Sequence, residues 1–365
     1  MGRRDTEGSH MIRQPGATRG LLHRVILALG CCAALAAIAL AEAAPATPPP
    51  YKKDAGPQKV ETAVYDWVDG ARNRTVPVRL YYPASGDGPL PLIVFSHGLG
   101  GSRDGYEYLG RHWAGHGYVS VHLQHKGSDA EVWRGKANPM ESMREAVLDV
   151  RSALDRPLDV HFAVDQMLRL NHEEGPLKGR IDFDRLGIAG HSFGAHTALA
   201  VAGLTTGGGE PRLADPRFKA AIAMSAPAPV RKDRLDAPYA RIRIPCLHMT
   251  GTEDSSPIGD TQPDQRRIPF DHIRAADQYL VTFAGGDHMV FSGRRWRGGD
   301  GAKDPLFHDL IRQSTTAFWD AYLKDDPAAR AWLAGGGFSA VLGKDGVFEK
   351  KLAAETAAPP VAVPE

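Results

Sequence analysis

The stretch Leu186-Gly187-Ile188-Ala189-Gly190-His191-Ser192-Phe193-Gly194 decides the fold of this 365-residue chain. A short apolar run leads into Gly-His-Ser-Phe-Gly, and a helical pattern begins at Phe193. A strand-turn-helix of this kind strains its central serine, so the positions two before and two after must lack bulk. Gly190 and Gly194 meet that need. The motif predicts that the Ser192 hydroxyl stands above a sheet edge, at the amino end of a helix.

Short apolar runs alternate with longer amphipathic segments on both sides of this motif. The alternation predicts an α/β fold, with a mostly parallel twisted sheet and helices on both faces. An antiparallel hairpin of residues 59–67 and 76–82 is expected to open the sheet. The expected buried strands are 92–95, 119–123, 186–189, 220–224, 244–249 and 278–283. The expected helices are 106–116, 140–153, 158–170, 193–204 and 306–322.

A serine needs a base to remove its proton and an acid to orient that base. In a fold of this kind the three follow in the order serine, acid, histidine. Asp254 follows the expected strand 244–249 and is the predicted acid, with Glu253 as the main alternative and Asp260 a weaker one. The next strand runs into Ala-Gly-Gly-Asp-His, which makes His288 the predicted base.

Attack by the serine creates an oxyanion that needs two hydrogen-bond donors. The amide of Phe193 is one predicted donor. The other is expected from the loop Ser96-His97-Gly98-Leu99-Gly100-Gly101-Ser102, most directly from the amide of Leu99. A plain glycine turn is the alternative. A dinucleotide-binding loop is excluded, because Arg103 stands where its third glycine belongs.

Other histidines offer competing interpretations. His191 adjoins the serine, but its side chain is expected to leave the turn on the other side. His112 and His116 are four residues apart on an expected helix, with His122 and His125 close behind, which raises a zinc site as an alternative. The residues between His112 and His116 lack the glutamate of a metalloprotease motif, so no metal is expected.

Charge and cysteine content exclude several classes of protein. With 44 Lys and Arg against 43 Asp and Glu, the net charge is +1, and no local basic patch favours nucleic acid. Of the 3 cysteines, Cys31 and Cys32 lie in an apolar run near the amino terminus, which leaves Cys246 as a predicted core residue.

The amino-terminal segment has the pattern of a secretory signal peptide. Arg13, Arg19 and Arg24 precede an uncharged run at 25–40, and Ala39-Leu40-Ala41 supplies the small residues of a cleavage site. A membrane anchor is the alternative, but this run spans only about 24 Å of helix against a bilayer core of about 30 Å.

The predicted organisation has four parts. These are a signal peptide (1–41), a Pro/Ala-rich linker (42–50), a folded domain (51–350) and a flexible tail (351–365). We therefore expect a periplasmic or secreted protein with no stable membrane anchor after cleavage.

The motifs resemble those of the α/β-hydrolase superfamily, in particular the platelet-activating factor acetylhydrolase and dienelactone hydrolase-like group. The resemblance rests on Phe95-Ser96-His97-Gly98-Leu99-Gly100, on the motif around Ser192, and on Arg156-Pro157-Leu158-Asp159-Val160, and it covers roughly residues 80–288. It implies Ser192 as nucleophile, His288 as base, and the amides of Leu99 and Phe193 as the oxyanion hole.

The chain departs from these families in two places. Animal acetylhydrolases place the acid just after the strand that follows the serine's helix, where this chain reads Met224-Ser225-Ala226-Pro227 with no carboxylate. The acid is therefore expected one strand later, at Asp254, as in dienelactone hydrolases and bacterial polyester hydrolases. True dienelactone hydrolases use a cysteine nucleophile, whereas this chain has Ser192.

These observations together predict an exported serine hydrolase that cleaves carboxylic esters through an acyl-enzyme, without cofactor or metal. Trp133 and Phe193 near the expected pocket favour short acyl or aryl esters of small molecules. The alternatives are an acetylhydrolase acting on phospholipid-like esters, a peptidase or acyltransferase on the same fold, and a non-catalytic binding protein.

Overall fold

The computed structural model describes residues 49–86, 88–205, 209–229, 231, 233–293 and 302–353. The chain divides into two units, Met1–Thr47 and Pro48–Glu365, and every described residue belongs to the second. The expected signal peptide, most of the linker and most of the tail therefore lie outside the described residues.

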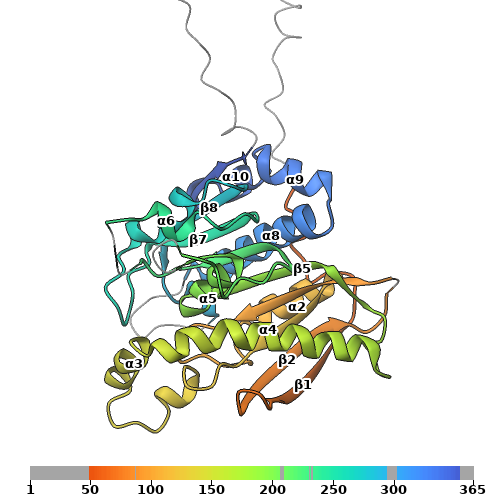
Figure 1. Ribbon diagram of the computed structural model, residues 1–365. Helices are drawn as coiled ribbons and strands as arrows, with labels where there is room; N and C mark the ends of the chain where they lie inside the picture. Colours follow the sequence, from red (N-terminus) through yellow and green to blue (C-terminus); the bar gives the residue numbers. More distant parts are fainter. Residues whose placement is uncertain are drawn as a thin grey trace, which may run out of the picture. The chain divides into compact units, whose positions relative to one another are not determined.

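The described residues form one nine-stranded sheet in the order β1-β2-β4-β3-β5-β6-β7-β8-β9 (Figure 1). From β4 through β3 to β8 neighbouring strands are parallel, whereas β2 pairs antiparallel with β1 and β4, and β9 pairs antiparallel with β8. The mostly parallel α/β sheet and its opening hairpin are confirmed. The strands are β1 Val60–Asp69, β2 Arg74–Pro83, β3 Leu90–Ser96, β4 Val119–Leu123, β5 Ile181–His191, β6 Phe218–Met224, β7 Cys246–Glu253, β8 Gln278–Asp287 and β9 Gly346–Lys351.

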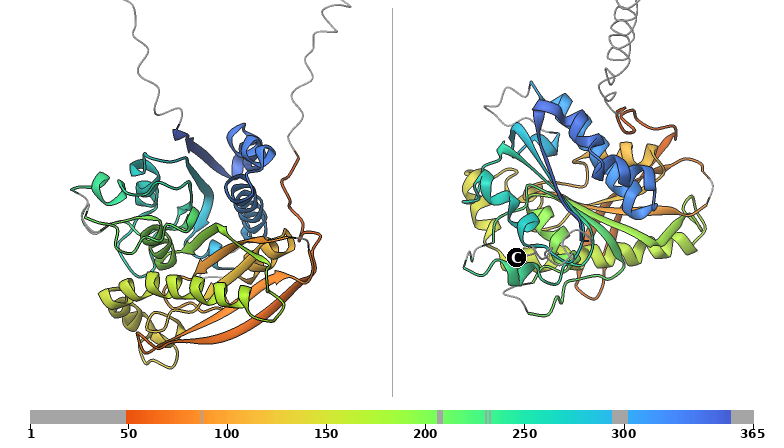
Figure 2. Two further views of the ribbon diagram at one scale, coloured as in Figure 1. Left: turned by 45° about the vertical axis from the view of Figure 1, so that its right-hand side comes forward. Right: turned by 90° about the horizontal axis from the view of Figure 1, so that it is seen from above.

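Helices cover both faces of the sheet. The two views of Figure 2 show helices on either side of the sheet. Residues in a strand alternate between faces, so Val94 belongs to the cluster with residues of α4 (Val150–His172) and α5 (Phe193–Ala202), while Phe95 belongs to the cluster with residues of α2 (Glu107–Gly115) and α8 (Asp304–Leu323). The α-helices are α2 Glu107–Gly115, α3 Pro139–Val147, α4 Val150–His172, α5 Phe193–Ala202, α6 Asp236–Tyr239, α7 Ile268–His272, α8 Asp304–Leu323, α9 Pro327–Ala334 and α10 Gly337–Leu342. Short 3₁₀ turns are η1 Ala130–Val132, η2 Pro263–Arg267, η3 Val290–Ser292 and η4 Gly343–Asp345.

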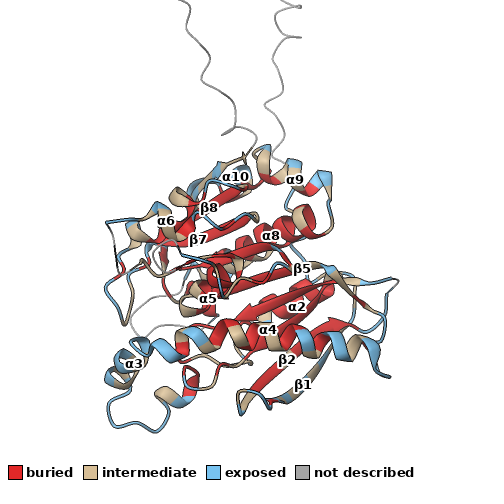
Figure 3. Ribbon diagram, in the orientation of Figure 1, coloured by how far each residue is buried: buried red, intermediate tan, exposed pale blue. Residues whose placement is uncertain are grey.

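Burial follows the layers. The central strands are buried, whereas α3 and the outward side of α4 are exposed (Figure 3). None of the described helices combines the length and the apolar character needed to span a bilayer.

Several strands extend beyond their expected ends, β5 most of all, since it begins at Ile181 and not at residue 186. One helix break and one strand also differ from the expectation. The break expected between helices 140–153 and 158–170 falls instead at Asp149, whose carboxylate accepts from the amides of Arg151 (3.0 Å) and Ser152 (3.3 Å) and starts α4. The helix then continues through Pro157 at the cost of one helical hydrogen bond. Strand β9 was not among the expected strands, because nothing local distinguishes it from the polar segments around it.

The turn between β5 and α5 fixes the carboxyl edge of the sheet. A Cβ atom at Gly190 would overlap the carbonyl oxygen of Gly194, and one at Gly194 would overlap the carbonyl oxygen of Ser96 at the end of β3. The two glycines therefore allow the helix to start directly against the neighbouring strand, as the sequence predicts.

Alanine at position 194 is expected to destabilise the fold, although alanine normally favours a helix over glycine. Its methyl group would force α5 away from β3, at a cost of about 1–3 kcal/mol or more in the free energy of unfolding. Urea denaturation of Gly194→Ala measures the loss. Gly70→Ala is the control, since a Cβ at Gly70 meets no atom within 4 Å, and its effect should stay within about 0.5 kcal/mol. Equal stability of the two variants would contradict the steric argument.

Candidate active site

Ser192 occupies the tightest point of the β5–α5 turn. Its backbone has φ 56° and ψ −118°, a conformation that residues other than glycine rarely adopt. Its amide donates to the carbonyl of Met224 at 2.8 Å. Strain of this kind persists only when the surroundings enforce it. The hydroxyl is 3.0 Å from Nε2 of His288.

The structure brings Asp254 and His288 together although 34 residues separate them. Nδ1 of His288 is 2.7 Å from Oδ1 of Asp254. The strands expected at 244–249 and 278–283 are longer than predicted: β7 runs through Glu253 and β8 through Asp287, so each side chain follows its strand directly. A Cβ at Gly251 would overlap the carbonyl of Gly286, so glycine here allows the two strands to approach closely.

The partners of Asp254 settle the direction of its hydrogen bonds. Oδ2 accepts from the hydroxyls of Ser225 (2.6 Å) and Thr250 (2.9 Å). An ionised carboxylate only accepts, so Oδ1 accepts from Nδ1–H of His288, which leaves Nε2 unprotonated and able to accept from the Ser192 hydroxyl. Nη2 of Arg266, a donor only, lies 3.2 Å from the same Nδ1 and is then a neighbouring charge rather than a hydrogen-bond partner. The alternatives Glu253 and Asp260 are exposed and have no such contact with His288 among the described residues.

Ser225 stands directly after β6, where the sequence analysis noted the missing carboxylate. Its φ is 52°, and its hydroxyl reaches across to Asp254, which follows the next strand. The chain thus holds a hydroxyl donor at that strand end and an acid at the neighbouring one.

Arg266 is a residue that the sequence analysis missed. Its guanidinium is buried, with Nε 3.3 Å from Oδ1 of Asp254 and 3.1 Å from the Asp254 carbonyl, and Nη1 donates to the carbonyls of Ser225 (2.9 Å) and Ala226 (3.1 Å). Burial lowers the pKa of Arg266, and Asp254 opposes that shift. A buried carboxylate needs such a compensating charge. An arginine in the polar segment before a short helix carries no local signal of this role.

The predicted oxyanion donors lie on either side of Ser192. Phe193 is the first residue of α5, so its amide has no acceptor within the helix. Leu99 lines the same cavity as Ser192, in a loop held by a bond from the Gly100 amide to the Ser128 carbonyl (2.9 Å). Trp133 also holds the loop, because its indole Nε1–H donates to the Gly100 carbonyl at 2.8 Å.

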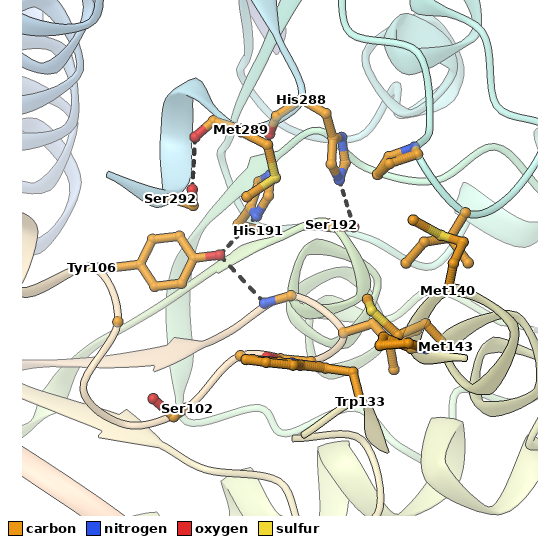
Figure 4. Close-up of a pocket in the computed structure, with 18 residues that line it drawn as sticks. Ser102, Tyr106, Trp133, Met140, Met143, His191, Ser192, His288, Met289 and Ser292 are labelled. Carbon is orange, nitrogen blue, oxygen red and sulfur yellow. Dashed lines mark hydrogen bonds between the residues drawn. The ribbon is translucent and has the colours of Figure 1, made fainter. Parts of the chain in front are cut away.

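A buried chain of hydrogen bonds joins this loop to the base. His191 donates through Nε2–H to the carbonyl of His288 (2.9 Å), so its Nδ1 must accept from the Tyr106 hydroxyl (2.8 Å). The Tyr106 oxygen in turn lies 3.5 Å from the amide of Gly98 (Figure 4). His191 is therefore turned away from the Ser192 hydroxyl, as expected.

The four histidines of the zinc alternative do not converge. The rings of His112 and His116 meet edge to face with centroids 4.6 Å apart, while His122 contacts Ser120 and His125 contacts Asp159. Over the described ranges, no group of three or more His, Cys, Asp or Glu side chains is placed to hold a metal ion.

A cavity of about 520 Å³ opens above Ser192. Trp133, Met140 and Met143 gather on one side of Ser192, and Met289 lies on the other side beside His288 (Figure 4). Met140 and Met143 come from α3, in the long crossover before β5. The described lining residues include no Lys, Arg, Asp or Glu.

Comparisons with known proteins agree with this architecture. Residues 73–151 match the family model described as platelet-activating factor acetylhydrolase, isoform II, and residues 133–289 match that described as serine hydrolase (FSH1). Similar proteins include platelet-activating factor acetylhydrolases of Bos taurus (26% identical; 55% of this chain, 48% of the relative) and Canis lupus familiaris (29%; 58% and 51%). Cutinase 2 of Thermobifida cellulosilytica is 29% identical over 41% of this chain and 52% of its own.

The fold and these matches define the class: the chain is a member of the α/β-hydrolase superfamily. Within that superfamily, its matches are with the serine hydrolase (FSH1) family model, with platelet-activating factor acetylhydrolases and with a cutinase. The chain spans about half the length of the curated relatives reported above.

Stability is expected to fall as the pH drops below about 6.5. Burial lowers the pKa of His122, His125 and His196 to about 4, so the folded protein binds fewer protons than the unfolded chain in this range. A depressed folded pKa gives stability that is complete above the unfolded pKa and is lost as the pH falls towards the folded one. Each histidine contributes up to about 1.4 kcal/mol per pH unit. Urea denaturation between pH 7.5 and 5 measures this slope, and a flat profile would contradict it.

Proposed function

We propose that this protein hydrolyses carboxylic esters through an acyl-enzyme on Ser192. His288 takes the hydroxyl proton during attack and returns it to the leaving alcohol, while Asp254 keeps the imidazole in the required tautomer. The amides of Leu99 and Phe193 bind the oxyanion. Water then repeats the cycle and releases the acid.

The observation that carries the proposal is the unbroken hydrogen-bond chain from Asp254 through His288 to Ser192, with distances of 2.7 and 3.0 Å. With Asp254 ionised, Nδ1–H of His288 donates to the carboxylate and the Ser192 hydroxyl donates to Nε2. A binding protein without activity would have no need for a strained serine aimed at an oriented imidazole below an open cavity.

The cavity supports small, uncharged acyl or aryl esters as the substrate class. Its described walls are apolar on the side of Trp133, Met140 and Met143, and thioether side chains adapt to ligands of different shape. Phospholipid-like esters are the second candidate, favoured by the similarity to acetylhydrolases. The apolar described walls of the cavity support the first candidate.

We extend the proposal to export. The support is the basic, apolar and small-residue pattern up to Ala41, which lies outside the described residues.

Substitution of the serine is expected to abolish activity while leaving the fold intact. Ser192→Ala should lower kcat for p-nitrophenyl acetate by about 10⁴-fold or more and prevent labelling by a fluorophosphonate probe. Circular dichroism checks that the variant is folded. A folded variant with full esterase activity would rule out the mechanism.

Asp254→Asn should cost about 10⁴-fold in kcat, because the asparagine NH2 can donate to Nδ1 and so favour the tautomer with its proton on Nε2, and because a neutral amide does not stabilise the imidazolium. Glu253→Gln is the matched control, since Glu253 adjoins the acid but is exposed, and its kcat should stay within about twofold. The reverse ranking would assign the acid to Glu253.

Steady-state kinetics on p-nitrophenyl acetate, butyrate and octanoate, a platelet-activating-factor analogue and an aminoacyl anilide distinguish the substrate classes. We expect the highest kcat/KM on the short esters. A preference for the phospholipid analogue would select the second candidate, and a preference for the anilide would indicate a peptidase.

A further inference from the structure

Arg156 is fully buried in α4, below the loop that follows β3. Among the described residues no carboxylate oxygen lies within ion-pair distance of its guanidinium. An arginine in the interior without a direct counter-ion is costly. The resemblance singled out the segment around Arg156, but the mechanism above gives it no role.

The guanidinium contacts three segments that surround Ser192. Nη2 donates to the hydroxyl of Ser96 (3.2 Å) and to the carbonyl of His97, which precedes Gly98 in the oxyanion loop. Nη1 donates to the hydroxyl of Ser128 (2.9 Å), and Nε donates to the hydroxyl of Thr197 (3.1 Å).

The residues that Arg156 contacts are themselves bonded to, or adjacent to, the segments that carry the predicted oxyanion donors Leu99 and Phe193. The Ser128 carbonyl accepts from the amide of Gly100, next to Leu99. The Thr197 hydroxyl donates to the carbonyl of Phe193 (3.0 Å), and the guanidinium carbon lies 4.5 Å from the centre of the Phe193 ring. One side chain therefore fixes the backbone on both sides of the serine.

Arg156 is linked to the carboxylate of Asp159 through two buried side chains, His125 and Ser96, and makes no direct ion pair with it. Burial would raise the pKa of Asp159, but hydrogen bonds from His125 and Arg74 lower it to about 2, so the carboxylate is ionised. It accepts from Nδ1–H of His125 (3.0 Å), whose Nε2 therefore accepts from the Ser96 hydroxyl (2.9 Å). The Ser96 oxygen then accepts from Arg156.

Ser96, His125 and Asp159 repeat the order of groups in the active site. All three side chains are essentially unexposed, and none lines the cavity above Ser192, so this second set has no access to substrate. Arg74 bonds to Asp159 directly, with Nε and Nη2 at 2.8 and 2.9 Å. Asp159 therefore has a direct ion pair with Arg74, whereas its link to Arg156 runs through His125 and Ser96.

We propose that Arg156 is a positioning residue of the oxyanion hole, which holds both donor segments in place and adds a buried positive charge behind them. The inference rests on the proposed ester hydrolysis. Charge fixed in a water-excluded site stabilises a developing oxyanion more than a solvated charge does. Because the oxyanion exists only in the transition state and the tetrahedral intermediate, the effect falls on kcat and not on KM.

Arg156→Met and Arg156→Lys test the proposal, with kcat expressed per site that a fluorophosphonate probe titrates. We expect Arg156→Met to lower kcat by about 10²-fold with KM changed by less than about threefold. The kcat of Arg156→Lys should be about tenfold higher than that of Arg156→Met, since the ammonium keeps the positive charge but lacks the several N–H donors of the planar guanidinium. The inhibition constant of phenylboronic acid, which forms a tetrahedral anion on serine, should rise in parallel with the fall in kcat.

Arg74→Met is the matched control. It removes an arginine from the same network but contacts neither the oxyanion loop nor α5, so it should lower stability and leave kcat per titrated site within about threefold. The inference is overturned if Arg156→Met keeps kcat within threefold of the wild type, or if Arg74→Met loses as much.

Should Arg156→Met fail to fold, Thr197→Val carries the test. It removes the acceptor of Nε at nearly constant volume, and we expect kcat to fall by about tenfold; an unchanged kcat overturns the inference. A wild-type protein inactive on every ester is a different result, because it overturns the proposed function itself.

Discussion

Two backbone segments meet at the carboxyl edge of the sheet with no space for a side chain between them. The start of α5 presses against the end of β3 at Gly194, and the turn before it closes on itself at Gly190. This packing holds Ser192 at a positive φ and orients its hydroxyl. It also brings the loop carrying Leu99 beside the first amide of α5. The position of Ser192 in turn sets where the ends of β7 and β8 must place Asp254 and His288 for the three side chains to be in contact.

Around that crossing, the buried polar groups form chains in which each donor has a defined acceptor. His191 links Tyr106 to the carbonyl of His288, and His125 links Ser96 to Asp159. Neutral imidazoles suit this purpose, because each ring has one donor and one acceptor and so sets the direction of a chain. Their depressed pKa values are the consequence of burial, and a proton added to any of them would reverse a hydrogen bond.

The acid of the site, Asp254, follows β7, while the end of the neighbouring strand β6 carries Ser225. β6 and β7 are neighbouring parallel strands, so their carboxyl ends lie side by side. Ser225 at the first end donates to Asp254 at the second. In this chain the hydroxyl at the first strand end holds the carboxylate at the second, and that carboxylate contacts the imidazole.

The sequence by itself determined the β5 turn, the central strands, the opening hairpin and the order Ser192, Asp254, His288, because turn chemistry and strand patterning are local properties. It did not determine that α4 continues through Pro157, that β9 completes the sheet, or that Arg266 lies against Asp254. Those features depend on partners more than ten residues away. Only the tertiary structure decided that Arg156 contacts three segments at once, because a buried arginine and a surface arginine look alike until packing encloses one of them.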